Sequence, residues 1–195
     1  MSEQRVELKD IFLLPNLWTS LQFITLPAML YSAWQRDLDQ FLLFYLISFA
    51  IDSTDGTLAR KTGKCSKLGL YLDTYLDVTM YGLVLLSIYW FIPEFLSTYL
   101  FAGLGIFTIT LLNRLASVIK FGRAIMLHLF TAKLMYFLLT LFLLDFYISG
   151  TPSDLLFTVL LVDAALFVLE ELLIVILLNE PREDMLSVFQ VVGRR

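Results

Sequence analysis

Residues 40–92 read QFLLFYLISFAIDSTDGTLARKTGKCSKLGLYLDTYLDVTMYGLVLLSIYWFI, and they contain two long apolar segments joined by a short polar one. An apolar run of about 20 residues is long enough to cross the hydrocarbon core of a bilayer as a helix. The joining segment holds Gly63 and several basic residues, which favour a turn. We therefore predict that residues 40–60 and 66–92 form two neighbouring transmembrane helices.

The rest of the chain has the same apolar character. Of its 195 residues, 58% are hydrophobic and 16% carry a formal charge, whereas roughly a quarter of the residues in a soluble domain are charged. The low numbers of Gly, Pro and Cys exclude collagen-like, disordered and disulfide-stapled proteins. Further apolar runs predict helices at 16–33, 95–113, 124–147 and 154–178. The predicted fold class is an all-α polytopic membrane protein with six transmembrane helices, the first of them bent at Pro27.

The basic residues predict the orientation of these helices. Cytoplasmic loops of membrane proteins carry an excess of Lys and Arg. With the N-terminus inside and six crossings, thirteen of the fourteen basic residues fall on the inner half, and only Arg36 falls outside. We therefore predict that both termini lie in the cytoplasm.

We expect a single transmembrane domain over residues 1–195. It would consist of a juxtamembrane segment at 1–14, a six-helix bundle at 15–178 and a cytoplasmic tail at 179–195. Residues 2–12 form either an amphipathic helix at the membrane interface or a frayed tail, and the sequence leaves both open.

Four aspartates stand at the adjoining ends of the two helices predicted at 40–60 and 66–92. Asp52 and Asp55 have i, i+3 spacing, and Asp73 and Asp77 have i, i+4 spacing, so each pair shares one helix face. Carboxylates at membrane depth are costly and point to a functional site. Four negative charges repel one another unless cations enter, and two divalent ions would balance them. Oxygen ligands suit Mg²⁺, Mn²⁺ or Ca²⁺ better than zinc.

Small residues accompany the acids. Ala59 lies one turn beyond Asp55, Gly56 follows that aspartate directly, and Gly69 stands four residues before Asp73. Small side chains let a backbone or a ligand approach closely. Ordinary helix packing is the alternative explanation, but it does not account for the four acids beside them.

Residues 52–77 match the pattern D-x2-D-G-x2-A-R-x8-G-x3-D-x3-D at every fixed position. These positions are Asp52, Asp55, Gly56, Ala59, Arg60, Gly69, Asp73 and Asp77. The stretch resembles the signature of the CDP-alcohol phosphatidyltransferase family of integral membrane enzymes. The LPNLWTSLQ segment at 14–22 is also similar to the family, although many members have Arg where Gln22 stands.

The resemblance implies an enzyme of phospholipid biosynthesis, a six-helix fold and a homodimer in the bilayer. It implies transfer of a phosphatidyl group from CDP-diacylglycerol to a small alcohol, with release of CMP and a need for Mg²⁺ or Mn²⁺. It implies that Asp52, Asp55, Asp73 and Asp77 bind metal and that Asp77 is the catalytic base. It also implies a CDP-lipid site at the cytoplasmic face, formed by Gly56, Ala59, Arg60 and Gly69. Arg60 would contact a phosphate there or reach the lipid headgroups instead.

Three cations are candidates for binding the acceptor alcohol. Arg114, Arg123 and Lys133 fall at the predicted inner ends of the fourth and fifth helices, and Lys133 precedes an uncharged run at 134–144. They would suit a phosphorylated acceptor such as glycerol 3-phosphate or inositol phosphate. Alternatively, the arginines only set topology and Lys133 pairs with Glu170 or Glu171. Because adjacent helical residues point about 100° apart, we expect one of these glutamates to pair with a cation of the fourth or fifth helix.

The identity of the acceptor stays open, because enzymes with the same signature also use serine, inositol, choline or phosphatidylglycerol as the acceptor. A divalent-cation transporter is the alternative class of function. It would favour a mid-membrane site on broken helices, whereas these acids stand at the inner helix ends. We predict no nucleic-acid partner.

Overall fold

The computed structural model describes residues 13–63, 66–122, 129–178, 180 and 187–192. Of residues 60, 67, 70, 71, 73, 74, 77, 78, 191 and 192 it describes the backbone alone. Every regular element in these ranges is a helix, which confirms the all-α fold. Residues 2–12, for which the sequence leaves an interface helix and a frayed tail open, lie outside the described residues. Contacts divide the chain into two compact units, Met1–Pro93 and Glu94–Arg195, and each is described by itself.

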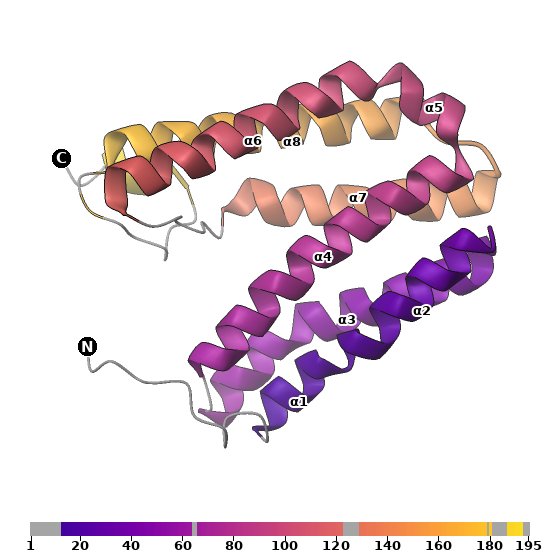
Figure 1. Cartoon of the computed structure of the whole chain (residues 1–195), viewed down its shortest axis with the longest axis horizontal. Coiled ribbons are helices and arrows are strands. Elements are labelled where there is room, and N and C mark those ends of the chain that lie inside the picture. The colour runs from indigo at the N-terminus through magenta and orange to yellow at the C-terminus, as the bar shows by residue number, and fades with distance from the viewer. Residues whose placement is uncertain (1–12, 64–65, 123–128, 179, 181–186, 193–195) are drawn as a thin grey trace. The chain divides into compact units, whose positions relative to one another are not determined.

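The described residues of the first unit form four helices (Figure 1). They are α1 (Leu14–Ser20), α2 (Gln22–Trp34), α3 (Leu38–Thr62) and α4 (Lys67–Phe91). Helices α1 and α2 pack against both α3 and α4, whereas α3 and α4 contact each other only sparingly. The two helices that carry the aspartates are therefore held largely through a third segment, α1–α2.

The predicted first helix is interrupted, but not at Pro27. The chain passes from α1 to α2 at Leu21, and α2 continues through Pro27. Leu21 keeps right-handed helical dihedrals, and its N–H bonds the carbonyl of Trp18, three residues back, at 3.1 Å. This i→i+3 bond is the tighter 3₁₀ geometry. The interruption is thus a local tightening of one helix rather than a proline break.

Capping residues end and begin the helices of the first unit where the sequence predicts turns. Asp37 Oδ1 accepts a hydrogen bond from the N–H of Gln40 at 2.9 Å in the first turn of α3. Gly63, just after α3, has φ +65°, which glycine adopts without the cost of a side chain. Ser66 caps α4 through its hydroxyl. The connection between α3 and α4 is consequently short.

The second unit contains the remaining described helices. They are α5 (Pro93–Thr98), α6 (Leu100–Phe121), α7 (Phe130–Ser149), α8 (Asp154–Leu177) and α9 (Phe189–Val192). Helix α8 packs against both α6 and α7. The predicted fourth helix proves to be α5 and α6, and α6 runs on to Phe121 because Gly122 ends it at φ +74°. The fifth helix was predicted to include Leu129, and this was wrong, because Leu129 is extended and α7 begins at the next residue.

Three helical segments are long and apolar enough to cross a membrane, as judged on the described residues. They are Leu38–Ala59, Leu100–Phe121 and Phe130–Ser149, and Thr79–Phe91 is a shorter apolar helix. Large apolar side chains on them are exposed, among them Phe101 at 86% and Ile119 at 85%. A surface of this kind suits lipid rather than water. Six spans and cytoplasmic termini stay predictions.

Candidate active site

Asp52 and Asp55 lie one turn apart near the end of α3. Asp55 is buried, with 7% of its surface exposed, and Asp52 is half-buried. The Thr19 hydroxyl of α1 donates a hydrogen bond to Asp55 Oδ2 at 2.9 Å. The same hydroxyl lies 3.1 Å from the Pro15 carbonyl, but its single proton serves one acceptor at a time. An ionised carboxylate is the stronger acceptor, so Thr19 fixes the orientation of Asp55.

Helix α1 is also bonded to the start of α4. Asn16 Nδ2 donates to the Ser66 hydroxyl oxygen at 2.9 Å, and that oxygen accepts the N–H of Gly69 at 3.0 Å. Asn16 is 2% exposed, so the contact is shielded from water. One face of α1 therefore reaches both helices of the acid motif, through Thr19 to α3 and through Asn16 to α4.

Gly69 is required by this contact. A Cβ atom built at Gly69 would lie 2.5 Å from Asn16 Oδ1 and 3.3 Å from the Ser66 hydroxyl oxygen. Atoms at the first of these distances overlap, so any larger residue at this position must displace Asn16. The spacing of the motif thus places a glycine where the Asn16 side chain of α1 lies against α4. The small residue at position 69 therefore admits a side chain of the neighbouring helix.

A second set of buried polar contacts joins α2 to α3. Thr25 and Ser48 share a hydroxyl hydrogen bond of 2.6 Å, and Gln22 Nε2 reaches the Ser48 carbonyl at 3.5 Å. Gln22 is 1% exposed, and its Oε1 has no hydrogen-bond partner among the described atoms. Gln22, at the position where many members of the similar family carry Arg, therefore faces α3 at Ser48. Ser48 lies one helical turn before Asp52.

For some of the other motif residues the structure describes only the backbone, and for the rest it also shows how exposed they are. Asp73 and Asp77 lie on α4, Arg60 lies on α3, and their side chains are outside the description. Gly56 is exposed and Ala59 is half-buried. No group of three or more His, Cys, Asp or Glu side chains that suits a metal occurs among the described ones, which exclude those of Asp73 and Asp77. The four-aspartate metal site stays a prediction.

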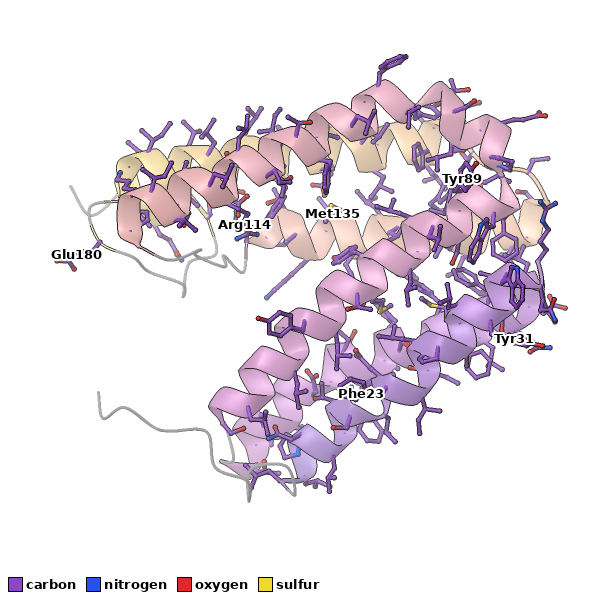
Figure 2. The ribbon with its side chains drawn as sticks, in the orientation of Figure 1. Phe23, Tyr31, Tyr89, Arg114, Met135 and Glu180 are labelled. Atoms are coloured by element: carbon purple, nitrogen blue, oxygen red, sulfur yellow. The ribbon has the colours of Figure 1, made fainter. Side chains whose placement is uncertain are left out.

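The second unit holds the predicted acceptor cations. Arg114 of α6 (Figure 2) lies 3.1 Å from Glu171 of α8, which is 2% exposed. This ion pair confirms the expectation that one of the two glutamates binds a cation of the fourth or fifth helix. Asn113 supports it, donating to the Val168 carbonyl at 2.8 Å and to Glu171 at 3.3 Å. Lys133 is exposed on the first turn of α7, and Arg123 lies outside the described residues.

Sequence reasoning missed the residues that position the motif. Asn16, Thr19 and Ser66 are common polar residues, and they are brought together from positions 36 to 50 residues apart. The LPNLWTSLQ segment was the only available signal, through its similarity to the family. Its Trp18 makes a further contact, donating from Nε1 to the Thr54 hydroxyl at 2.9 Å.

The CDP-alcohol phosphatidyltransferase family model matches residues 12–177, which cover most of both units. The chain therefore belongs to this family. No curated protein and no solved structure matches it. Family membership makes the chain a membrane transferase of phospholipid synthesis, with a CDP-alcohol as substrate and an alcohol as acceptor. Members of the family generally depend on a divalent cation.

Proposed function

We propose that the chain transfers a phosphatidyl group from CDP-diacylglycerol to the hydroxyl of a small phosphorylated alcohol and releases CMP. The observation that carries the proposal is the buried carboxylate of Asp55, held by Thr19 at the end of α3 that adjoins α4. A carboxylate in a water-poor site costs free energy unless a cation or substrate uses it. Family membership supplies the class of reaction.

The donor set fits a divalent ion. Asp52 and Asp55 offer hard oxygen ligands from one face of α3, and Asp73 and Asp77 stand at the adjoining end of α4. The Asp55 carboxylate accepts its α1 hydrogen bond from a neutral hydroxyl, which orients the carboxylate and leaves its charge in place. We assign these four aspartates to two Mg²⁺ or Mn²⁺ ions. When bound, such ions neutralise the pyrophosphate oxygens and the departing CMP.

The reaction is an in-line displacement at phosphorus. The acceptor oxygen forms a bond to the phosphorus that carries diacylglycerol, and the phosphoanhydride bond to CMP breaks. CMP leaves with the bonding electrons, and the proton of the acceptor hydroxyl passes to the carboxylate of Asp77. Gly56 and Ala59 leave room beside the acids for the CDP group, Gly69 admits the Asn16 side chain that borders it, and Arg60 binds one of the CDP phosphates.

We assign the site to the cytoplasmic face of a six-helix bundle. The excess of Lys and Arg after α3 and at both chain ends supports this orientation. Three helical segments meet the length and hydropathy of a span. The remaining three spans would be α1 together with α2, α4, and α8. The second half of α4 is apolar, and α8 is a continuous helix that contains acidic residues. The homodimer also stays a prediction, which sedimentation of the detergent-solubilised protein tests.

Lys133 supports a phosphorylated acceptor. Its side chain is exposed on α7, whereas Arg114 is already paired with Glu171. Lys133→Met should raise the acceptor KM and leave the KM for CDP-diacylglycerol unchanged, and Lys133→Arg should retain most of the affinity. An unchanged acceptor KM in Lys133→Met would remove Lys133 from the site.

The deciding experiment measures CMP release by the purified chain. The assay contains Mg²⁺ or Mn²⁺, CDP-diacylglycerol and one acceptor at a time from a panel that includes glycerol 3-phosphate, inositol phosphate, inositol, serine, choline and phosphatidylglycerol. We expect release with a phosphorylated alcohol. If no acceptor leads to CMP release, the proposed phosphatidyltransferase activity is rejected. Asp77→Asn should abolish release while CDP still binds, because the substitution removes the base and keeps the shape of the site.

A further inference from the structure

Glu170 is the first of two adjacent acids in α8, and its contacts differ from those of Glu171. Its Oε2 accepts a hydrogen bond from the Thr131 hydroxyl at 3.0 Å, and its Oε1 accepts the backbone N–H of Val188 at 3.0 Å. Adjacent helical residues point about 100° apart. Glu171 is accordingly bound to α6, whereas Glu170 is bound to α7 and to the segment near the C-terminus.

Apolar packing holds the same segment. Leu129, Ile174 and Leu178 form a buried cluster, and Val188 packs against it. Leu129 is fully buried and immediately precedes α7. Val188 is thus fixed twice, by its N–H on Glu170 and by its side chain against the buried cluster that includes Leu129.

These contacts converge on the first turn of α7. Thr131 and Lys133 both lie in this turn, and the Lys133 N–H makes the first backbone bond of the helix, to the Leu129 carbonyl at a long 3.4 Å. A weak first turn is free to fray unless other groups hold it. The Glu170 carboxylate is also favourable beside a helix N-terminus, where the backbone dipole is positive.

We propose that residues 187–192 form a C-terminal strap, and that Glu170 is a positioning residue that uses the strap to set the first turn of α7 and hence Lys133. The inference rests on the proposed function, because Lys133 is there the acceptor-binding cation. Glu170 touches neither substrate nor metal in this scheme. Its effect on the reaction is confined to acceptor binding.

Glu170→Gln separates the two bonds with little change of shape. A glutamine has one acceptor oxygen where glutamate has two. With that oxygen facing the Val188 N–H, the acceptor there is neutral, and the Thr131 hydroxyl must turn to accept from the amide nitrogen. Thr131→Val removes only the hydroxyl, and Thr131→Ser restores it. Glu180→Gln is the matched control, since Glu180 is an exposed acid beyond the end of α8 (Figure 2).

Hydrogen–deuterium exchange in detergent micelles tests the strap without any activity. Residues 187–192 should be protected in the wild type and in Glu180→Gln. In Glu170→Gln their exchange should rise about three- to tenfold, the factor expected when a charged hydrogen-bond acceptor is replaced by a neutral one. Exchange equal to that of the wild type would overturn the strap.

Kinetics test the positioning role. Glu170→Gln and Thr131→Val should raise the acceptor KM about three- to tenfold, as loss of one ordinary hydrogen bond would. The KM for CDP-diacylglycerol should not change, and Thr131→Ser should recover the wild-type acceptor KM. Faster exchange with an acceptor KM like that of Glu180→Gln would overturn the positioning of Lys133. If the wild type releases no CMP with any acceptor, the proposed function fails, and the exchange result still decides whether the strap exists.

Discussion

Gly69→Ala should destabilise the first unit although it replaces glycine by a better helix former. The added Cβ would lie 2.5 Å from Asn16 Oδ1, so Asn16 must move, and its hydrogen bond to Ser66 is lost or weakened. Overpacking of this kind costs about 1–3 kcal/mol, and a hydrogen bond is worth about 0.5–1.5 kcal/mol. The helix propensity of alanine offsets up to about 1 kcal/mol of this. We expect a net loss of about 1–3 kcal/mol.

Gly82→Ala is the matched control. Gly82 lies in the same helix, and a Cβ built there meets nothing within 4 Å. This variant therefore gains the helix propensity without the overlap and should be neutral or more stable. Thermal unfolding can be followed by the fluorescence of the three tryptophans in detergent. For a chain of this size each kcal/mol shifts Tm by roughly 2–4 °C, so the two alanine variants should be clearly separated.

A double-mutant cycle identifies the overlapping atom. Asn16→Ala removes the side chain that Gly69→Ala would displace, so the double variant should be no less stable than Asn16→Ala alone. Contacting residues typically show coupling of about 0.5–3 kcal/mol, and distant ones add. Simple additivity, or a Gly69→Ala variant as stable as Gly82→Ala, would refute the close approach of α1 to α4.

Thr19→Val should raise the Mg²⁺ or Mn²⁺ concentration needed for half-maximal CMP release by about 10- to 100-fold, as loss of a group that orients a metal ligand does, and Thr19→Ser should not. Asp55→Asn should abolish CMP release at every metal concentration, measured in the same titration. Arg114→Met should lower Tm because Glu171 is left buried without its cation, at a cost near the lower end of about 3–5 kcal/mol, since Arg114 is 35% exposed. The double variant Arg114→Met with Glu171→Leu should recover most of that stability. Chelation by EDTA should stop CMP release, and added Mg²⁺ or Mn²⁺, but not Zn²⁺, should restore it.

The sequence predicted the helices that carry the acids and the turn between them, because long apolar runs and a glycine at a chain reversal are local signals. It did not predict the break at Leu21, since Pro27 was the more obvious cause of a distortion. In the structure, 3₁₀-type bonds from Leu21 to Trp18 and from Ile24 to Leu21 accompany the change, while Pro27 stays inside α2. A shift of this kind is decided by packing against α3 and α4 rather than by composition.

The paired glutamates show the same limit. Helical geometry predicted that only one of Glu170 and Glu171 could bind a given cation. It could not determine which, because that depends on how α8 is rotated against α6. In the structure, Glu171 forms an ion pair with Arg114, whereas Glu170 accepts hydrogen bonds from Thr131 and Val188. The contacts of Glu170 could not be predicted from the sequence, because nearly every residue type has a backbone N–H and the identity of Val188 does not indicate that it donates one here.

The acid motif belongs to three segments rather than two. Its aspartates come from α3 and α4, but these helices contact each other sparingly, whereas α1 bonds both. Asn16 and Thr19 have i, i+3 spacing and therefore share one face of α1, yet Asn16 is bonded to the start of α4 and Thr19 to the end of α3. A change in the distance between the two acid pairs must consequently strain α1. The conformation of this short helix is thus coupled to the spacing of the carboxylates, although α1 contributes no acid of its own.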